Sequence, residues 1–166
     1  MKWRFLFCLL AAVDVQAAHP SKAAIASCLS GRPASPAVTV DELARSPVRI
    51  IDSRSGYRAL YYFTDGGKDI GYVAKGNRYG LLYANEIYLL SSAKRLPGIK
   101  LRPGDFDPFF TAWRKVSDAN GLYLCVTFPV GDPVPKGGVQ NRAYLLPLGA
   151  APRAKNLFFA SARADA

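Results

Sequence analysis

The chain has 166 residues, with 22 lysines and arginines against 12 aspartates and glutamates, which gives a formal net charge of +10 at pH 7. A chain of this length is one ordinary domain, and its positive balance indicates acidic or anionic partners without specifying a fold. The only histidine, His19, is expected to lie in a disordered N-terminal segment. The composition therefore argues against histidine-dependent catalysis, nucleophilic triads and histidine metal sites.

The first 18 residues have the pattern of an export signal. Lys2 and Arg4 precede an apolar stretch, residues 5–13, and small side chains follow up to the predicted cleavage point after Ala17 or Ala18. The apolar stretch has nine residues, whereas a membrane-spanning helix needs about 20. We therefore expect cleavage and a secreted or periplasmic protein without a transmembrane span.

Two cysteines remain in the predicted single globular domain, residues 19–166, after Cys8 leaves with the signal. Cys28 and Cys125 would meet an oxidising compartment as the only thiols, so a disulfide between them is expected. An alternative starts from residues 25–28, IASC, which resemble the lipobox at which bacterial lipoproteins are acylated. Polar residues separate it from the apolar stretch, so a lipid anchor at Cys28 is the less favoured interpretation.

The N-terminal part of this domain is predicted to form two short helices. Residues 21–30 show helical spacing of apolar residues, with a serine at the start and Gly31 past the end. Thr39 followed by Glu42 has the spacing of a capping box and predicts a second helix, which must end by Ser46 because Pro47 follows it.

The middle of the chain predicts an antiparallel meander. Residues 57–64 alternate as in a strand, and Asp65–Lys68 and Gly76-Asn77 supply the glycines of two tight hairpins. Residues 81–93 favour neither helix nor strand clearly. A strand up to Leu90 with a turn at Ala84-Asn85 is the preferred interpretation.

The second half is predicted to hold one amphipathic helix and the centre of the sheet. Residues 94–104 are predicted to form a loop. A helix is then predicted to begin at Asp107 and end at Asn120-Gly121, with Phe109, Trp113 and Val116 as its apolar stripe. Residues 122–128 form a nearly continuous apolar strand around Cys125, which predicts burial on both faces. Residues 143–148 and 157–160 are expected to form a final strand pair. The predicted fold is a single-domain α+β protein: an antiparallel sheet with a meander, short N-terminal helices, and one amphipathic helix on one face.

The search for catalytic groups yields one weak candidate. Glu86 is the only acid in a predicted apolar element, where burial could raise its pKa toward use as a general acid of a carboxylate-dependent hydrolase. A solvent-facing strand glutamate is the favoured interpretation. No cysteine pair has zinc spacing, and the glycine pairs lack the spacing of a phosphate-binding loop, so neither a metal nor a cofactor is predicted.

Basic and aromatic side chains give the candidate binding residues. Tyrosines and cations interleave in the meander, as on a surface that stacks against a glycan or a single-stranded nucleic acid, although half-buried strand tyrosines are the simpler explanation and export argues against nucleic acid. The segment 94–102 is basic, and no acidic residue occurs between Glu86 and Asp105. The candidate residues are Lys94, Arg95, Lys100, Arg102, Arg58, Tyr62 and Arg78.

These features predict an exported, non-enzymatic binding protein. The preferred partner is an acidic protein of the cell envelope or extracellular space, which this chain would bind as an inhibitor or immunity-type protein. An anionic polymer, such as a cell-wall glycan or lipopolysaccharide, is the first alternative, and the Glu86 hydrolase is the second.

Overall fold

A computed structural model describes residues 19–43, 56–104, 110–130, 140–149 and 156–163. The elements are α1 (Lys22–Ser30), β1 (Thr39–Glu42), β2 (Arg58–Asp65), β3 (Lys68–Lys75), β4 (Arg78–Tyr83), β5 (Glu86–Leu89), the 3-10 helix η1 (Leu90–Ser92), β6 (Lys94–Arg95), β7 (Ala112–Asp118), β8 (Gly121–Val130), β9 (Gln140–Pro147) and β10 (Phe158–Arg163). The strands form a six-stranded sheet in the order β1-β7-β8-β9-β10-β6 and a four-stranded sheet in the order β2-β3-β4-β5. The predicted α+β class with a meander is confirmed.

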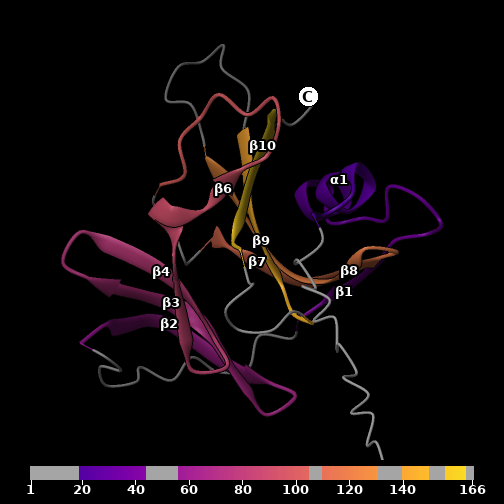
Figure 1. Ribbon diagram of the computed structural model, residues 1–166. Helices are drawn as coiled ribbons and strands as arrows, with labels where there is room; N and C mark the ends of the chain where they lie inside the picture. Colours follow the sequence, from indigo (N-terminus) through magenta and orange to yellow (C-terminus); the bar gives the residue numbers. More distant parts are fainter. Residues whose placement is uncertain (1–18, 44–55, 105–109, 131–139, 150–155, 164–166) are drawn as a thin grey trace, which may run out of the picture.

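The two sheets and the helix form three layers (Figure 1). The six-stranded sheet lies in the middle, α1 covers one of its faces, and the four-stranded meander packs on the other. The sheet is antiparallel except where β6 pairs with β10. A layered arrangement of this kind buries the apolar face of each element against a neighbour.

Strand β8 has side chains in both cores, which confirms the predicted burial of residues 122–128. Leu124, Val126 and Phe128 belong to the core shared with the meander. Tyr123 and Cys125 belong to the core beneath α1. Because successive side chains of a strand point to opposite faces, one apolar run supplies both layers.

The disulfide links α1 to the centre of the sheet. Cys28 and Cys125 are bonded, with 5.8 Å between their Cα atoms and a sequence separation of 97. The predicted pairing is therefore confirmed, and the Cys28 sulfur is not free to carry a lipid. Just past the helix, Gly31 adopts φ 72°, and a side chain there would lie 2.8 Å from the Arg114 guanidinium carbon, so glycine fits both the backbone and the space.

The meander has the predicted turns. Gly66, Gly67 and Gly76 all have positive φ in the two expected hairpins. Ala84 and Asn85 connect β4 to β5 with φ of 50° and 72°, as a two-residue hairpin of the I′ type requires. The preference for a strand and turn over a helix in this region is confirmed.

The helix predicted from Thr39 is wrong, because Thr39–Glu42 is strand β1. It pairs antiparallel with β7, so that Val40 lies opposite Val116 and Glu42 opposite Arg114. The capping-box spacing is a local signal, and pairing with a distant strand overrides it.

The predicted helix from Asp107 is also wrong over residues 112–118. Ala112–Asp118 is strand β7, whereas Asp107 and Phe109 lie outside the described residues. Trp113 and Val116 point to opposite faces of β7 and enter different cores. Asn120 and Gly121 belong to the hairpin turn into β8, where both of their N–H groups donate to the Asp118 carboxylate.

The last strand pair is confirmed, and the loop beside it needs a correction. Strands β9 and β10 pair antiparallel, with Phe158 opposite Leu145. The segment 94–104 is not wholly a loop, because Lys94 and Arg95 form β6 and run parallel to β10. The predicted signal, residues 1–18, lies outside the described residues.

Loss of the disulfide should destabilise the protein strongly. In the loop-entropy account, a crosslink over a separation of 97 residues contributes about 4 to 5 kcal/mol, which native-state strain or residual denatured structure can reduce. We expect Cys28→Ala/Cys125→Ala to unfold at a much lower urea concentration than the parent, monitored by Trp113 fluorescence. Dithiothreitol should destabilise only the parent, and equal midpoints for the two proteins would contradict this prediction.

Candidate functional site

A groove beside α1 is the best candidate for a functional site in the described part of the chain. Its volume is about 890 Å³, and ligand pockets in proteins typically enclose about 300 to 1,000 Å³. Most of the described lining side chains are apolar and none of these is acidic. The lining residues are His19, Pro20, Lys22, Ile25, Ala26, Leu29, Ser30, Leu96, Pro97, Ile99, Asn141, Ala160, Ser161 and Ala162.

One wall of the groove is the face of α1 that carries Ile25 and Leu29. Ala24 and Cys28 are fully buried against the sheet. Ile25 and Leu29, also four residues apart, are half-buried and line the groove. Residues four apart share one face of a helix, so α1 presents two adjacent apolar stripes and buries only one of them completely.

The opposite wall is the chain that follows β6. The Leu96 N–H donates to the Phe159 carbonyl over 3.0 Å, and the Ile99 N–H donates to the Leu96 carbonyl over 3.2 Å. These bonds hold Leu96, which is buried, and Ile99, which is half-buried, against the sheet edge. The floor between the walls is formed by Ala160, Ser161 and Ala162 of β10.

The β7–β8 turn holds the start of α1. Ser21 caps the helix by accepting from the Ala24 N–H, and its own N–H donates to Asp118 over 3.1 Å. Asn120 donates to the His19 carbonyl, and the His19 ring lies 4.8 Å from that of Phe158. The expectation that His19 is disordered is therefore wrong. With the disulfide near its other end, α1 is held at both ends beside the groove.

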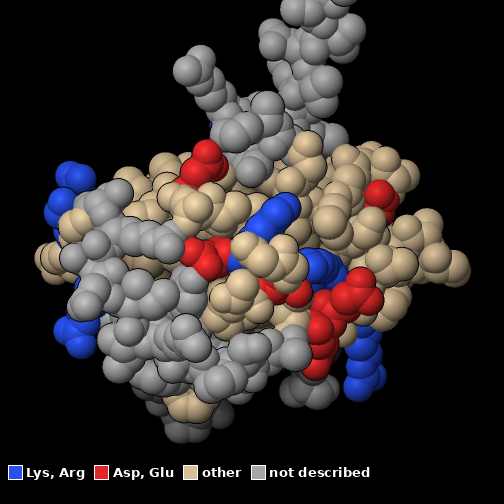
Figure 2. Space-filling model, turned by 90° about the horizontal axis from the view of Figure 1, so that it is seen from below, with Lys and Arg blue, Asp and Glu red and all other residues tan. Residues whose placement is uncertain are grey.

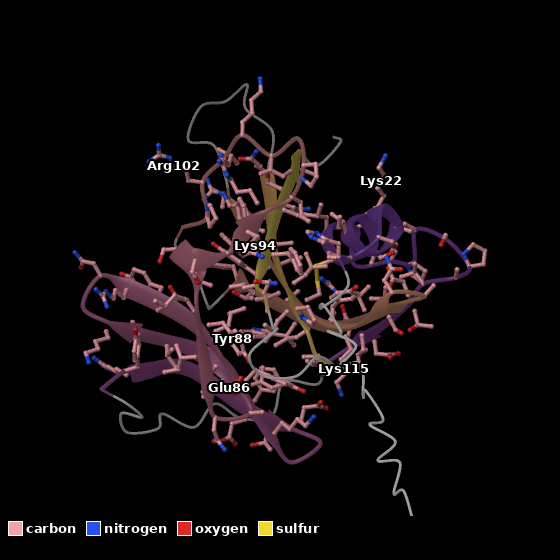
Figure 3. All side chains as sticks on the ribbon, viewed as in Figure 1. Lys22, Glu86, Tyr88, Lys94, Arg102 and Lys115 are labelled. Atoms are coloured by element: carbon pink, nitrogen blue, oxygen red, sulfur yellow. A yellow bond between two sulfur atoms is a disulfide. The ribbon has the colours of Figure 1, made fainter. Side chains whose placement is uncertain are left out.

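Cations occur in the lining of the groove and beside its lining residues in sequence. Lys22 lines it, and the exposed cations Lys94, Arg95 and Lys100 flank the lining residues 96–99. Arg102 is also exposed but lies farther away: in Figure 3 it and Lys22 project on opposite sides, with Lys94 between them. The structure therefore places three of the four predicted cations of segment 94–102 next to the groove in sequence.

The meander cations form a separate group at its β3–β4 turn. Strand register places Arg58 opposite Ala74 and Lys75 opposite Arg78. The Lys75 ammonium also lies 5.8 Å from the centre of the Tyr57 ring, a cation–π contact. Tyr62 in β2 lies opposite Gly71 in β3. The structure does not describe the side chain of Tyr62.

Glu86 makes a structural hydrogen bond. It begins the edge strand β5, and its carboxylate accepts a short hydrogen bond from the Tyr88 hydroxyl two residues on. Burial, this hydrogen bond and neighbouring charges raise the pKa of Tyr88 well above its usual value. Figure 3 labels both residues below Lys94, on the side away from Arg102. Glu86 is not among the residues that line the groove.

Acidic and basic side chains mix on the face seen in Figure 2. Lys115 pairs with Asp65 at 2.5 Å, which joins β7 to the meander, and Arg114 pairs with Glu42 at 3.3 Å. Such exposed or half-exposed pairs each contribute about 0 to 1 kcal/mol. Among the described residues on this face, the cations do not gather into a single patch.

Within the described ranges, no group of three or more histidine, cysteine or acidic side chains could hold a metal ion. None of the helices that the structure describes is long and apolar enough to cross a membrane. Comparison with protein families, with characterised proteins and with solved structures finds no match to this chain.

The sequence analysis did not predict the apolar lining of the groove. Two signals were present: Ile25 and Leu29 form a second stripe beside Ala24 and Cys28, and Leu96 and Ile99 interrupt a basic segment. Neither stripe reveals that the two segments meet, because they are separated along the chain by the whole meander.

Tyr123, in the core beneath α1, should make the free energy of unfolding fall at alkaline pH. Burial raises the pKa of Tyr123 to about 12, and the charge of Asp118 adds to this effect. The unfolded chain loses this proton near pH 10, where the folded protein still holds it. The stabilisation is therefore complete below pH 10 and is lost as the pH rises toward 12. We expect Tyr123→Phe to weaken the fall in unfolding free energy across this window, measured by urea titrations at pH 8 to 12. Parallel pH profiles for parent and variant would contradict the assignment.

Proposed function

We propose that this chain is an exported, non-enzymatic protein that binds an acidic partner protein through the groove beside α1. The observation that carries the proposal is an apolar groove of about 890 Å³ with Lys22 in its lining, three further cations beside its lining residues in sequence, and no acid among its described lining residues. An apolar centre with a charged rim is the usual arrangement of a protein interface. Charges of one sign around it speed the encounter with a partner of the opposite sign.

Export is part of this proposal. The Cys28–Cys125 disulfide is compatible with an oxidising compartment outside the cytoplasm. Cleavage after Ala18 would leave His19 as the first residue, and its own α-ammonium group would then add a further positive charge at the groove. An inhibitor or immunity-type role for an acidic envelope protein is the specific form that we favour.

The processing step predicts a defined mature chain. Mass spectrometry of the protein isolated from its source should show a first residue of Ala18 or His19, because cleavage is expected after Ala17 or Ala18. The mass should also be two hydrogens lower than that of the reduced chain. A natural protein that retains Met1 would contradict export by this signal.

Charge reversal beside the groove tests partner binding. We expect Lys94→Glu/Arg95→Glu/Lys100→Glu to weaken capture of an acidic protein from envelope extract about tenfold or more at low salt, because the variant reverses the attraction around the groove. Raising the salt concentration should weaken capture by the parent in the same way. Quantitative mass spectrometry of the captured proteins gives the measurement.

The matched control is Arg58→Glu/Lys75→Glu/Arg78→Glu, which changes the net charge equally at the β3–β4 turn. The captured partner should bind this variant nearly as well as the parent. Equal losses in both variants would show a nonspecific effect of net charge, and loss only in the control would move the site to the meander. Either result contradicts the proposed site.

The meander cations favour a second candidate function. Arg58, Lys75 and Arg78 gather at one turn beside Tyr57, an arrangement suited to an anionic polymer such as a cell-wall glycan or lipopolysaccharide. The same two variants distinguish this function, because polymer retention would be lost in the meander variant.

A further inference from the structure

Part of the β10 edge has no strand partner among the described residues. The Lys94 N–H donates to the Leu157 carbonyl and the Leu96 N–H to the Phe159 carbonyl, so alternate residues of β10 direct their peptide groups toward β6. By this alternation Ser161 and Arg163 direct theirs the same way. However, β6 pairs only with Phe158 and Phe159.

The chain leaves this edge where the groove begins. Pro97 follows Leu96 and has no N–H with which to continue the ladder. Ser161 is half-exposed and lines the groove together with Ala160 and Ala162. The peptide groups with which no described strand pairs therefore lie beside the apolar groove.

We infer that the groove takes an extended segment of the acidic partner, which adds as a short strand beside Ser161–Arg163 of β10. This inference rests on the proposed function and specifies how that partner binds. Strand addition would supply hydrogen bonds at Ser161 and Arg163 that no described strand supplies, and the apolar side chains on one face of the segment would fill the groove. Those side chains would contact Ile25, Leu29, Leu96 and Ile99, which line the groove on either side of the edge.

The charges favour an acidic segment over a second copy of this chain. Lys22 lines the groove, Lys94, Arg95 and Lys100 flank its lining residues 96–99 in sequence, and none of its described lining residues is acidic. A second copy would bring a chain of formal charge +10 against these cations, which costs free energy through repulsion. Carboxylates of a partner segment, outside the groove, would meet the same cations favourably.

The groove is also held in place before binding. Asp118 and Asn120 hold the segment that precedes α1, the disulfide holds Cys28, and Asn141 donates to the Leu29 carbonyl over 3.4 Å. A partner segment therefore meets a wall that is already ordered, which reduces the entropy lost on binding.

The test uses a displayed library of random octapeptides, selected on the folded mature chain. We expect the selected peptides to be rich in aspartate and glutamate, with apolar residues at alternate positions. Ser161→Pro should weaken their binding about tenfold or more, because it removes the outward N–H and places a ring at the edge without removing a bond to β9. Ser161→Ala, the matched control, should bind within about twofold of the parent, since it keeps the backbone groups.

Amide hydrogen exchange gives a readout specific to strand addition. Peptide binding should slow exchange at Ser161 and Arg163, whose N–H groups face away from β9, more than at Ala160 and Ala162, which already pair with β9. If Ser161→Pro fails to fold, Ala26→Trp replaces it, because Ala26 is exposed and lines the groove. Ala37→Trp, at an exposed position outside the lining, is then its control.

The inference fails if no peptide is enriched, if the selected peptides bind Ser161→Pro as well as the parent, or if Ser161 and Arg163 gain no protection. A natural partner that is lost by charge reversal at Lys94, Arg95 and Lys100 but retained by Ser161→Pro would overturn strand addition alone. The proposed function would survive that result.

Discussion

The burial of β8 on both faces is the constraint on which the other layers depend. Its alternate residues are apolar on both sides, so a layer on one face alone would leave the other exposed to water. Leu124, Val126 and Phe128 require the meander, and Tyr123 and Cys125 require a cover on the opposite side. The four-stranded meander is wide enough to cover the first face. The opposite face is covered by α1, a helix of nine residues.

The groove follows from the small size of that helix. A helix of this length extends about 14 Å, which does not cover the whole face of a six-stranded sheet. The disulfide fixes α1 over β8, so the uncovered part falls toward β10 and β6. Proteins usually protect open sheet edges, because unpaired peptide groups invite association. Here β6 pairs with only two residues of β10, and no other described strand covers that edge. The excess positive charge of the chain opposes association with another copy of itself.

The elements that the sequence predicted correctly are those set by local chemistry. Ser21 and Gly31 mark the ends of α1, glycines mark the meander turns, and the apolar run around Cys125 marks the central strand. The two wrong helices have a common cause. Strand β7 is buried on both faces near Trp113 and Val116, and an apolar pair three residues apart also fits one side of a helix. Strand β1 exists through its pairing with β7, which no local pattern encodes.

The site was harder to predict than the fold because its parts come from distant segments. The sequence shows that segment 94–102 is basic. Whether its cations can attract an acidic partner depends on whether acidic side chains lie near them in the fold. In the structure several acids are engaged elsewhere: Asp65 with Lys115, Glu42 with Arg114 and Asp118 with the segment before α1. Among the described lining residues of the groove Lys22 is charged and none is acidic, and the lining includes the part of β10 that lies beyond its pairing with β6. The disulfide and the β7–β8 turn fix the position of α1 and so determine which part of the sheet the helix leaves uncovered. The net positive charge of the chain can attract a partner to that surface only after the fold has exposed it.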